Sequence, residues 1–218
     1  MREHALIVAS WITVAVLAAI ATIALALLPE GARIPVHWNV AGEADRYAGA
    51  AFGLFTPVVM SALLSLAFAV LPRIEPLQTR MQGSAVLYRV TWAGLLALMV
   101  VVEVLVAAPA FGWTPSATLP LAVVGTLLIV VGNVLPKSRP GFFVGIRTPW
   151  ALLDTDNWIA THRLGAWTMM AGGAALLIAG LLPMTPAARM VIVIGALLVS
   201  TLPPVVYSWL LWHRREPR

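Results

Sequence analysis

Residues 132–165 read GNVLPKSRPGFFVGIRTPWALLDTDNWIATHRLG, a polar interval between two long apolar runs. Its segment GIRTPW starts with a glycine, which permits positive φ, and contains a proline that pushes the threonine before it toward an extended conformation. A rigid turn is therefore predicted here. Asp154 stands where a helix N-cap belongs, and Asp156 falls in the first turn, where the helix dipole favours negative charge. The next helix is predicted to begin before its apolar part.

The composition indicates an integral membrane protein. Hydrophobic residues make up 61% of the chain and charged residues only 11%, with a mean hydropathy of +0.91, whereas soluble domains are about 45–50% apolar. The chain has no cysteine, which excludes disulfides, thiolate chemistry and cysteine-ligated metals. The net charge of +5 is concentrated in short segments beside apolar runs, where Lys and Arg report topology. We predict no direct nucleic-acid partner.

Six apolar runs are close to the length of about 20 residues that a helix needs to cross a bilayer. They cover residues 5–28, 54–71, 85–108, 117–135, 164–182 and 188–212. The first is longer than the apolar core of about 7–15 residues in a cleaved signal peptide, so we predict a retained span. Two adjacent prolines, Pro203 and Pro204, are expected to kink the last run. The predicted fold class is an all-α integral membrane protein with six transmembrane helices.

The basic residues predict the orientation. An even number of spans places both termini on one side, and that side carries Arg2, Arg73, Arg80, Arg89, Lys137, Arg139, Arg147, Arg163, Arg214, Arg215 and Arg218. The other side carries Arg33, Arg46 and Arg189. Under the positive-inside rule, the N and C termini and the central interval are cytoplasmic. Tryptophans near the same ends of the spans support this, because their rings prefer the membrane interface; they are Trp11, Trp92, Trp167, Trp209 and Trp212.

A second polar interval, residues 34–47, reads IPVHWNVAGEADRY and is expected on the outer side. His37, Trp38 and Asn39 form a polar and aromatic group, and Asp45 follows after a turn. One interpretation is a compact loop that caps the bundle. The other is a surface that meets a molecule arriving from outside.

Several side chains suggest a metal centre, but the topology argues against it. His37 and Asp45 are expected outside, whereas Asp154, Asp156 and His162 are expected inside, across a bilayer core of about 30 Å. The three inner residues make a poor ligand set by themselves, because helix positions two apart point in different directions. We predict neither a metal nor another cofactor.

Glu103 is the one acid inside a predicted span. A charged side chain at mid-membrane costs about 2.5–3.5 kcal/mol on insertion scales, so Glu103 should face protein or water. It is a proton or cation site, a structural partner of Arg189 or Arg33, or a group that water reaches from outside. A Glu103→Gln variant that inserts normally but loses activity would favour the first interpretation.

The central interval also leaves two interpretations open. Lys137, Arg147 and Arg163 either recognise an anionic partner, because guanidinium groups pair with carboxylates, or mark the topology beside lipid phosphates. Aromatic residues indicate that the interval is packed or interfacial; they are Phe142, Phe143, Trp150 and Trp158. On the following helix, Asp154, Trp158, Thr161 and Gly165 fall along one face.

These motifs resemble a known family. The pattern GN-x-x-PK-x-R-P, the GIRTPW segment, the Asp-rich turn, Trp158 and the sequence Thr161-His162-Arg163-x-Gly165 are similar to the SdpI family of bacterial membrane proteins. The outer motif looks like the small domain of unknown function that commonly precedes that module. Gly141 departs from the pattern, where asparagine is expected. The resemblance implies a two-helix unit with the outer loop at residues 1–72 and a four-helix module with the GIRTPW loop at residues 73–218.

The resemblance implies a toxin-immunity protein of the bacterial plasma membrane. The family's namesake protects its cell from a secreted peptide toxin and, when toxin is present, holds a small transcriptional repressor at the membrane. The expected partners are therefore membrane lipids, a secreted peptide toxin and such a repressor at the cytoplasmic face. The expected binding residues are Asn133, Arg147, Trp150, Asp154, Trp158, His162 and Arg163 inside, and His37, Trp38, Asn39 and Asp45 outside.

Two other classes of function stay open. One is a small proton-coupled transporter or exporter, in which Glu103 is the coupling group. The other is a membrane enzyme acting on lipid or peptide, in which Asp154 and His162 serve as acid and base. We expect binding without catalysis, because the sequence contains none of the motifs that carry specific catalytic mechanisms.

Overall fold

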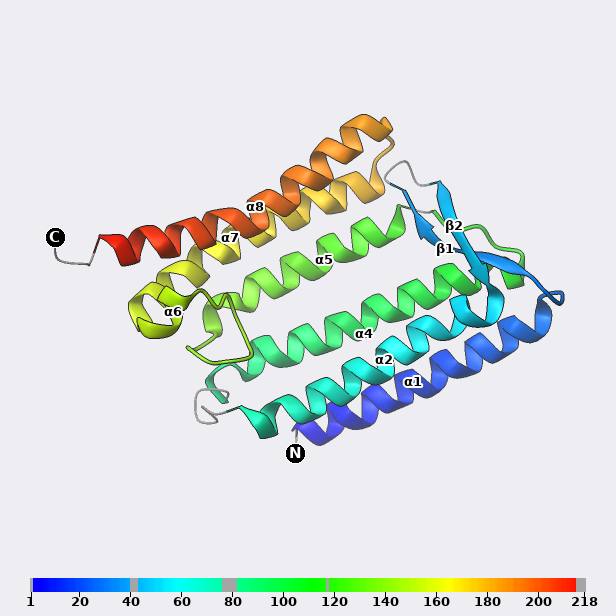
Figure 1. Cartoon of the computed structure of the whole chain (residues 1–218), viewed down its shortest axis with the longest axis horizontal. Helices are drawn as coiled ribbons and strands as arrows, with labels where there is room; N and C mark the ends of the chain where they lie inside the picture. The colour runs from blue at the N-terminus through cyan, green and yellow to red at the C-terminus, as the bar shows by residue number, and fades with distance from the viewer. Residues whose placement is uncertain (1, 40–42, 76–81, 117, 215–218) are drawn as a thin grey trace.

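The computed structural model describes residues 2–39, 43–75, 82–116 and 118–214 (Figure 1). Its long helices are α1 (Arg2–Leu27), α2 (Ala50–Ile74), α4 (Ala85–Ala107), α5 (Leu119–Val134), α7 (Thr155–Leu181) and α8 (Pro186–His213). The shorter elements are β1 (Arg33–Trp38), β2 (Ala44–Gly49), the 3-10 turns η1 (Ala108–Phe111) and η2 (Leu135–Lys137), and α6 (Pro149–Leu153). Six helices are long and apolar enough to cross a membrane, which confirms the predicted fold class.

The six long helices form two groups of three. Helices α1, α2 and α4 pack against one another, α7 packs between α5 and α8, and the contact of α4 with α5 joins the groups. Both ends of the chain lie at one end of the bundle, together with α6, and the β1–β2 hairpin lies at the other (Figure 1). We call these the terminal end and the hairpin end.

The basic residues divide between the two ends as predicted. Arg73 lies in the last turn of α2, Lys137 in η2 and Arg214 at the C-cap of α8, all at the terminal end. Arg189, in the first part of α8, lies at the hairpin end. Arg80, Arg215 and Arg218 lie outside the described residues. The cytoplasmic placement of the terminal end stays a prediction.

Two helices begin before the apolar runs predicted for them. Helix α2 begins at Ala50, directly after β2, rather than at residue 54, because the residues between β2 and the apolar run are also helical. Helix α7 begins at Thr155, with Asp154 as its N-cap, so the prediction of an early start is confirmed. Helix α8 runs unbroken through Pro203 and Pro204.

The outer interval forms an antiparallel hairpin, which sequence reasoning interpreted as a loop. Strand β1 pairs with β2, from Arg33 opposite Gly49 to Trp38 opposite Ala44. The side chain of Ile34 is buried in the core that α1 and α2 share, and Trp38 packs against the same core. A Cβ on Gly53 would lie 2.8 Å from Ile34 Cδ1, so this glycine lets α2 approach the hairpin closely. The hairpin caps one end of the bundle.

One tryptophan belongs to the core rather than to the membrane interface. Trp92 is only 1% exposed and stacks on Phe68, with ring centroids 5.5 Å apart. Tyr88 packs beside both rings and donates a hydrogen bond to the carbonyl of Phe68. The expectation for Trp92 was wrong, because its helix face is turned toward α2. Trp167 is 72% exposed, and its interfacial position stays a prediction.

Glycines bring α5 and α7 into backbone contact. A Cβ on Gly173 would lie 2.6 Å from the carbonyl oxygen of Gly125, and a Cβ on Gly125 would lie 2.5 Å from that of Gly173. Small residues allow such close approach, which gives membrane helices their packing energy. The pair therefore fixes α7, the helix that carries Trp158 and His162, against α5.

A Gly173→Ala variant is expected to lower the free energy of unfolding by about 2 kcal/mol, because the added methyl group must push two backbones apart. Reversible unfolding in bicelles would measure this. Gly195→Ala on α8 is the matched control, since a Cβ there meets nothing within 4 Å. It should be neutral or stabilising by up to about 1 kcal/mol. Equal effects of the two substitutions would contradict the close-packing argument.

Candidate functional site

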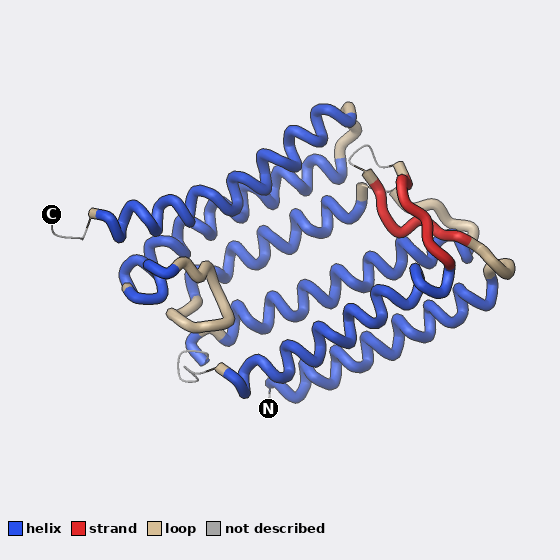
Figure 2. Tube along the Cα trace, viewed as in Figure 1, coloured by secondary structure: helices blue, strands red, loops and turns tan. Residues whose placement is uncertain are grey.

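Part of the central polar interval forms a loop, which we call the strap, across the terminal end of the bundle. The strap, residues 138–148, follows η2 and leads into α6; Figure 2 shows it as the loop beside α6. Thr148 caps α6 by accepting a hydrogen bond from the backbone N–H of Ala151 at 3.2 Å. The strap contacts α7 and α8 along one edge and the end of α2 and the start of α4 along the other.

A stacked pair of rings supports the middle of the strap. Trp158 and His162, one turn apart on α7, stack with ring centroids 4.0 Å apart and are 0% and 1% exposed. The Trp158 indole N–H donates to Ser138 Oγ at 3.2 Å. His162 Nε2 accepts from the backbone N–H of Ile146 at 2.9 Å. His162 Nδ1 lies 2.8 Å from the Trp158 carbonyl and therefore carries the proton, because a carbonyl can only accept. Both ring nitrogens are occupied by backbone groups.

A buried polar network ties the strap to α7 and α8. Asn157 Oδ1 accepts from Thr161 Oγ1 at 3.0 Å and from Ser208 Oγ at 2.8 Å. Its amide Nδ2 donates to the Ser208 carbonyl at 2.8 Å. Ser208 Oγ also lies 2.6 Å from Thr148 Oγ1. Asn157, Thr161 and Ser208 are fully buried. The network therefore gives these polar groups hydrogen-bond partners within the protein, which they need where water is absent.

The other helix group holds the opposite edge of the strap. Glu75, just after α2 and only 3% exposed, accepts the backbone N–H groups of Phe142 and Phe143, both at 3.2 Å. Ser84 Oγ accepts from the backbone N–H of Arg139 at 2.9 Å. The strap thus bridges the two groups of three helices. Sequence reasoning missed Glu75 and Ser84, because nothing in their local spacing sets them apart from ordinary loop residues.

The predicted inner residues fall into two sets. Trp158 and His162 lie beneath the strap, and Asp154 Oδ1 caps α7 by accepting the N–H groups of Asp156 and Asn157 at 2.9 and 3.3 Å. The remainder lie at the surface: Asn133, Arg147 and Arg163 are exposed and Trp150 is half-buried. Arg147 donates from Nη1 to the Phe142 carbonyl at 2.7 Å, which folds the strap back on itself.

The two candidates for acid and base at the strap, Asp154 and His162, are both engaged in structural hydrogen bonds. Asp154 serves as a helix cap, and the ring nitrogens of His162 serve the backbone. Among the described residues, no three His, Asp or Glu side chains are placed to hold a metal ion. The site is built to hold a loop in one shape and to present its outer surface.

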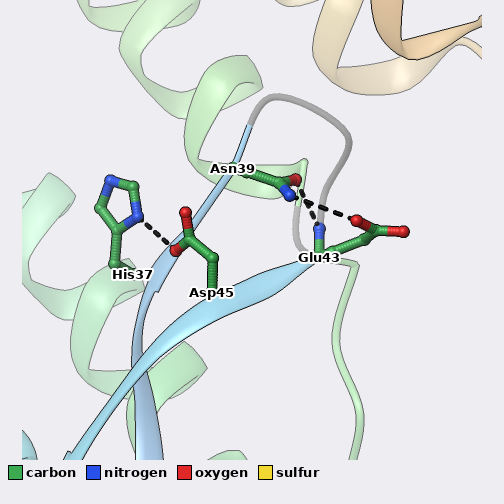
Figure 3. A network of polar contacts seen from close by, with 4 residues as sticks. All are labelled: His37, Asn39, Glu43 and Asp45. Carbon is green, nitrogen blue, oxygen red and sulfur yellow. Dashed lines mark hydrogen bonds and ion pairs between the residues drawn. The ribbon is translucent and has the colours of Figure 1, made fainter.

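The predicted outer residues link the two strands of the hairpin (Figure 3). His37 Nδ1 lies 2.6 Å from Asp45 Oδ1. Asn39 donates to Glu43 Oε2 at 3.2 Å and accepts from the Glu43 backbone N–H at 3.0 Å. The hydrogen bond from His37 holds the pKa of Asp45 below its usual range. These residues lie at the opposite end of the bundle from the strap, so the two candidate sites are separate.

The lowered pKa of Asp45 predicts a pH dependence of the hairpin. Because folding favours the carboxylate, this contribution is fully present above the ordinary Asp pKa of about 3.9 and is lost as the pH falls through the lower, folded-state value. Hydrogen exchange of β1 and β2 amides, corrected for intrinsic rates, should therefore accelerate below about pH 4. In Asp45→Asn that acceleration should be absent; the same acid response in both proteins would contradict the role of the pair.

Glu103 lies on α4 at the hairpin end and is fully buried. Within the described part of the chain, neither of its carboxyl oxygens has a hydrogen-bond partner. The predicted pairing with Arg189 or Arg33 is wrong, because Arg189 Nε donates to the Ala179 carbonyl at 3.2 Å and Arg33 Nη2 to the Tyr47 carbonyl at 2.8 Å. The guanidinium groups are thus held by backbone carbonyls.

Comparison with known families matches two segments of the chain. The model of the SdpI/YfhL protein family matches residues 137–208, which contain the whole strap, α6, α7 and α8 as far as Ser208. A domain of unknown function, DUF1648, matches residues 11–62, which contain the hairpin. No curated protein and no solved structure shows significant similarity. The chain is therefore a multi-pass membrane protein that contains a segment similar to the SdpI/YfhL family after a segment similar to DUF1648.

Proposed function

We propose that this protein gives a bacterium resistance to a secreted, membrane-active peptide toxin by binding it, and that it resides in the plasma membrane with the strap in the cytoplasm. The observation that carries the proposal is the SdpI/YfhL match over residues 137–208. That segment contains the strap. It also contains Asn157 on α7 and Ser208 on α8, which hydrogen-bond to each other in the buried network. The proposed mechanism is stoichiometric binding or a conformational response, without turnover.

The division of the polar residues supports binding. Trp158, His162 and Asn157 are buried and hold the strap, while the exposed Arg147 and Arg163 leave cationic groups at its surface. Among the described residues, neither arginine has a carboxylate within ion-pair distance. An acidic protein surface would complement them. We propose that the toxin engages the hairpin end, where His37 and Asp45 are solvent-exposed, and that protection also requires the strap to respond to this binding. A small transcriptional repressor docks at the strap.

Survival of a toxin-sensitive bacterium tests this function. Cells expressing the parent protein should survive challenge with a secreted membrane-active peptide, and cells expressing Arg147→Ala at the same membrane level should lose most of that protection. Arg214→Ala is the matched control, because Arg214 is also an exposed arginine at the terminal end but lies outside the strap. Protection by neither the parent nor the control, across several such toxins, would contradict the proposal.

Glu103 favours one competing function, a small proton-coupled transporter. A fully buried carboxyl with no partner among the described residues is costly in a membrane, and such groups often mark ion or proton pathways. In that case the parent protein in proteoliposomes would show gradient-dependent flux, and Glu103→Gln would abolish it while keeping the fold. Toxin protection by Glu103→Gln equal to that of the parent, without any flux in either, would remove this alternative.

A further inference from the structure

An apolar cavity lies beneath the strap, at the junction of the two helix groups. It has a volume of about 270 Å³. Side chains from α2, α4, α5, η2, α7 and the strap form its walls, among them Leu87, Tyr88, Val131, Leu135, Ile146 and Met169. We call this the strap cavity. The Tyr88 hydroxyl, which could otherwise attract water, donates to the Phe68 carbonyl.

The cavity suits an apolar occupant. Apolar protein cavities of about 150 Å³ stay dry and take up small apolar molecules, and the strap cavity is larger. If the cavity were empty, the side chains that line it would lack van der Waals partners on that side. Around it are helices that are long and apolar enough to span a membrane, so aliphatic chains are the most abundant apolar groups within reach.

Three basic residues are close neighbours, in the sequence, of residues that line the cavity. Arg89 and Arg147 directly follow the lining residues Tyr88 and Ile146, and Lys137 ends the 3-10 turn that starts at Leu135. Arg89 Nε and Arg147 Nη1 donate to backbone carbonyls, at 3.0 and 2.7 Å. Across the described residues, no carboxylate forms an ion pair with these three side chains. An anionic group would complement their positive charge.

We infer that the strap cavity binds one acyl chain of an anionic phospholipid, whose phosphate lies at the rim formed by Arg89, Lys137 and Arg147. The apolar walls accept the chain, and the cations complement the headgroup, as basic pockets between membrane helices do for anionic lipids. Because the strap covers the cavity and bridges both helix groups, the lipid would brace the strap from below. This inference does not depend on toxin immunity.

Native mass spectrometry of the purified full chain, titrated with phosphatidylglycerol, tests the site. The parent should bind one lipid. Val131→Phe, which fills the cavity with a ring, should raise the Kd about tenfold by displacing buried methylene groups. Val123→Phe is the matched control, since it makes the same change on the same helix beside a separate hollow that Gly94 and Thr126 line. It should leave the Kd unchanged.

Two further measurements separate the parts of the proposal. Lys137→Gln should raise the Kd for phosphatidylglycerol about fivefold, as expected for one basic residue at an anionic surface, and leave that for phosphatidylcholine unchanged; Arg214→Gln should do neither. A phosphatidylglycerol with a photoreactive acyl chain should crosslink in the parent to Val131, Leu135 or Met169, which does not depend on any variant folding. Equal binding by Val131→Phe and Val123→Phe, crosslinks confined to other surfaces, or a cavity crosslink to an apolar peptide that lipid cannot displace would overturn the inference.

Discussion

Gly145→Ala should release the strap from the bundle and lower the free energy of unfolding by about 3 kcal/mol, from backbone strain and steric overlap together. Gly145 has φ of +115°, in a region that L side chains rarely adopt. A Cβ there would lie 2.5 Å from His162 Nε2 and 2.7 Å from Trp158 Cζ2. The added methyl group would thus displace the nitrogen that accepts the Ile146 N–H.

Trypsin under native conditions provides the measurement, because the strap contains Arg147, which is followed by Thr148; Arg139 is followed by Pro140 and is not a trypsin site. Cleavage after Arg147 should be much faster in Gly145→Ala than in the parent. Gly141→Ala is the control within the same strap: its φ is not positive, and the nearest atom to a Cβ is the Arg139 carbonyl oxygen at 3.6 Å. It should change stability by less than about 0.5 kcal/mol. Equal cleavage of both variants would show that Gly145 is not what seats the strap.

Position 145 also shows how far the sequence can predict the site. The GIRTPW segment predicted a rigid turn with a glycine at positive φ, and both features are present. Asp154 as an N-cap was equally predictable, because capping depends on neighbours along the chain. The same holds for the six apolar helices, whose length and composition are local properties.

What the sequence could not predict depends on contacts between distant segments. Glu75 meets Phe142 and Phe143 across almost seventy positions, with sequence separations of 67 and 68, and no local pattern connects them. The hairpin was missed because Pro35 and the register shifts between Pro35 and Trp38 disturb the alternation that would mark a strand. One interpretation paired Glu103 with Arg189 or Arg33 because all three were expected near the same membrane surface. In the fold, Glu103 has no partner among the described residues, and the two arginines donate to backbone carbonyls.

The exposed members of the predicted site pose a related problem. Asn133 was chosen as a binding residue for its place in the motif, whereas Asn157, nearby in the same motif, was not chosen. In the fold, Asn157 is the structural residue of the two: it is fully buried between α7 and α8, whereas Asn133 is exposed on α5. A motif therefore mixes residues that shape the site with residues at its surface, and burial separates the two.

Asn157→Ala should be the most destabilising substitution in the polar network, at about 3 kcal/mol or more, because each buried polar group that loses its partner costs about 1–3 kcal/mol. The change removes the acceptor of Thr161 Oγ1 and the donor to the Ser208 carbonyl. Ser208 Oγ keeps only Thr148 Oγ1 as a partner. Steric trapping in bicelles would give the free energy of unfolding for the parent and the variant.

Asn133→Ala makes the same chemical change at an exposed position and should shift the unfolding free energy by no more than about 0.5 kcal/mol. Within the described residues, Asn133 makes no hydrogen bond through its side chain, so a loss of toxin protection in Asn133→Ala without a loss of stability would mark it as a contact residue. A larger loss of stability in Asn133→Ala than in Asn157→Ala would mean that the buried network does not hold α8 to the strap. Since α7 reaches α8 through Asn157 and reaches the strap through His162, the two variants together decide whether the site's shape resides in its interior or at its surface.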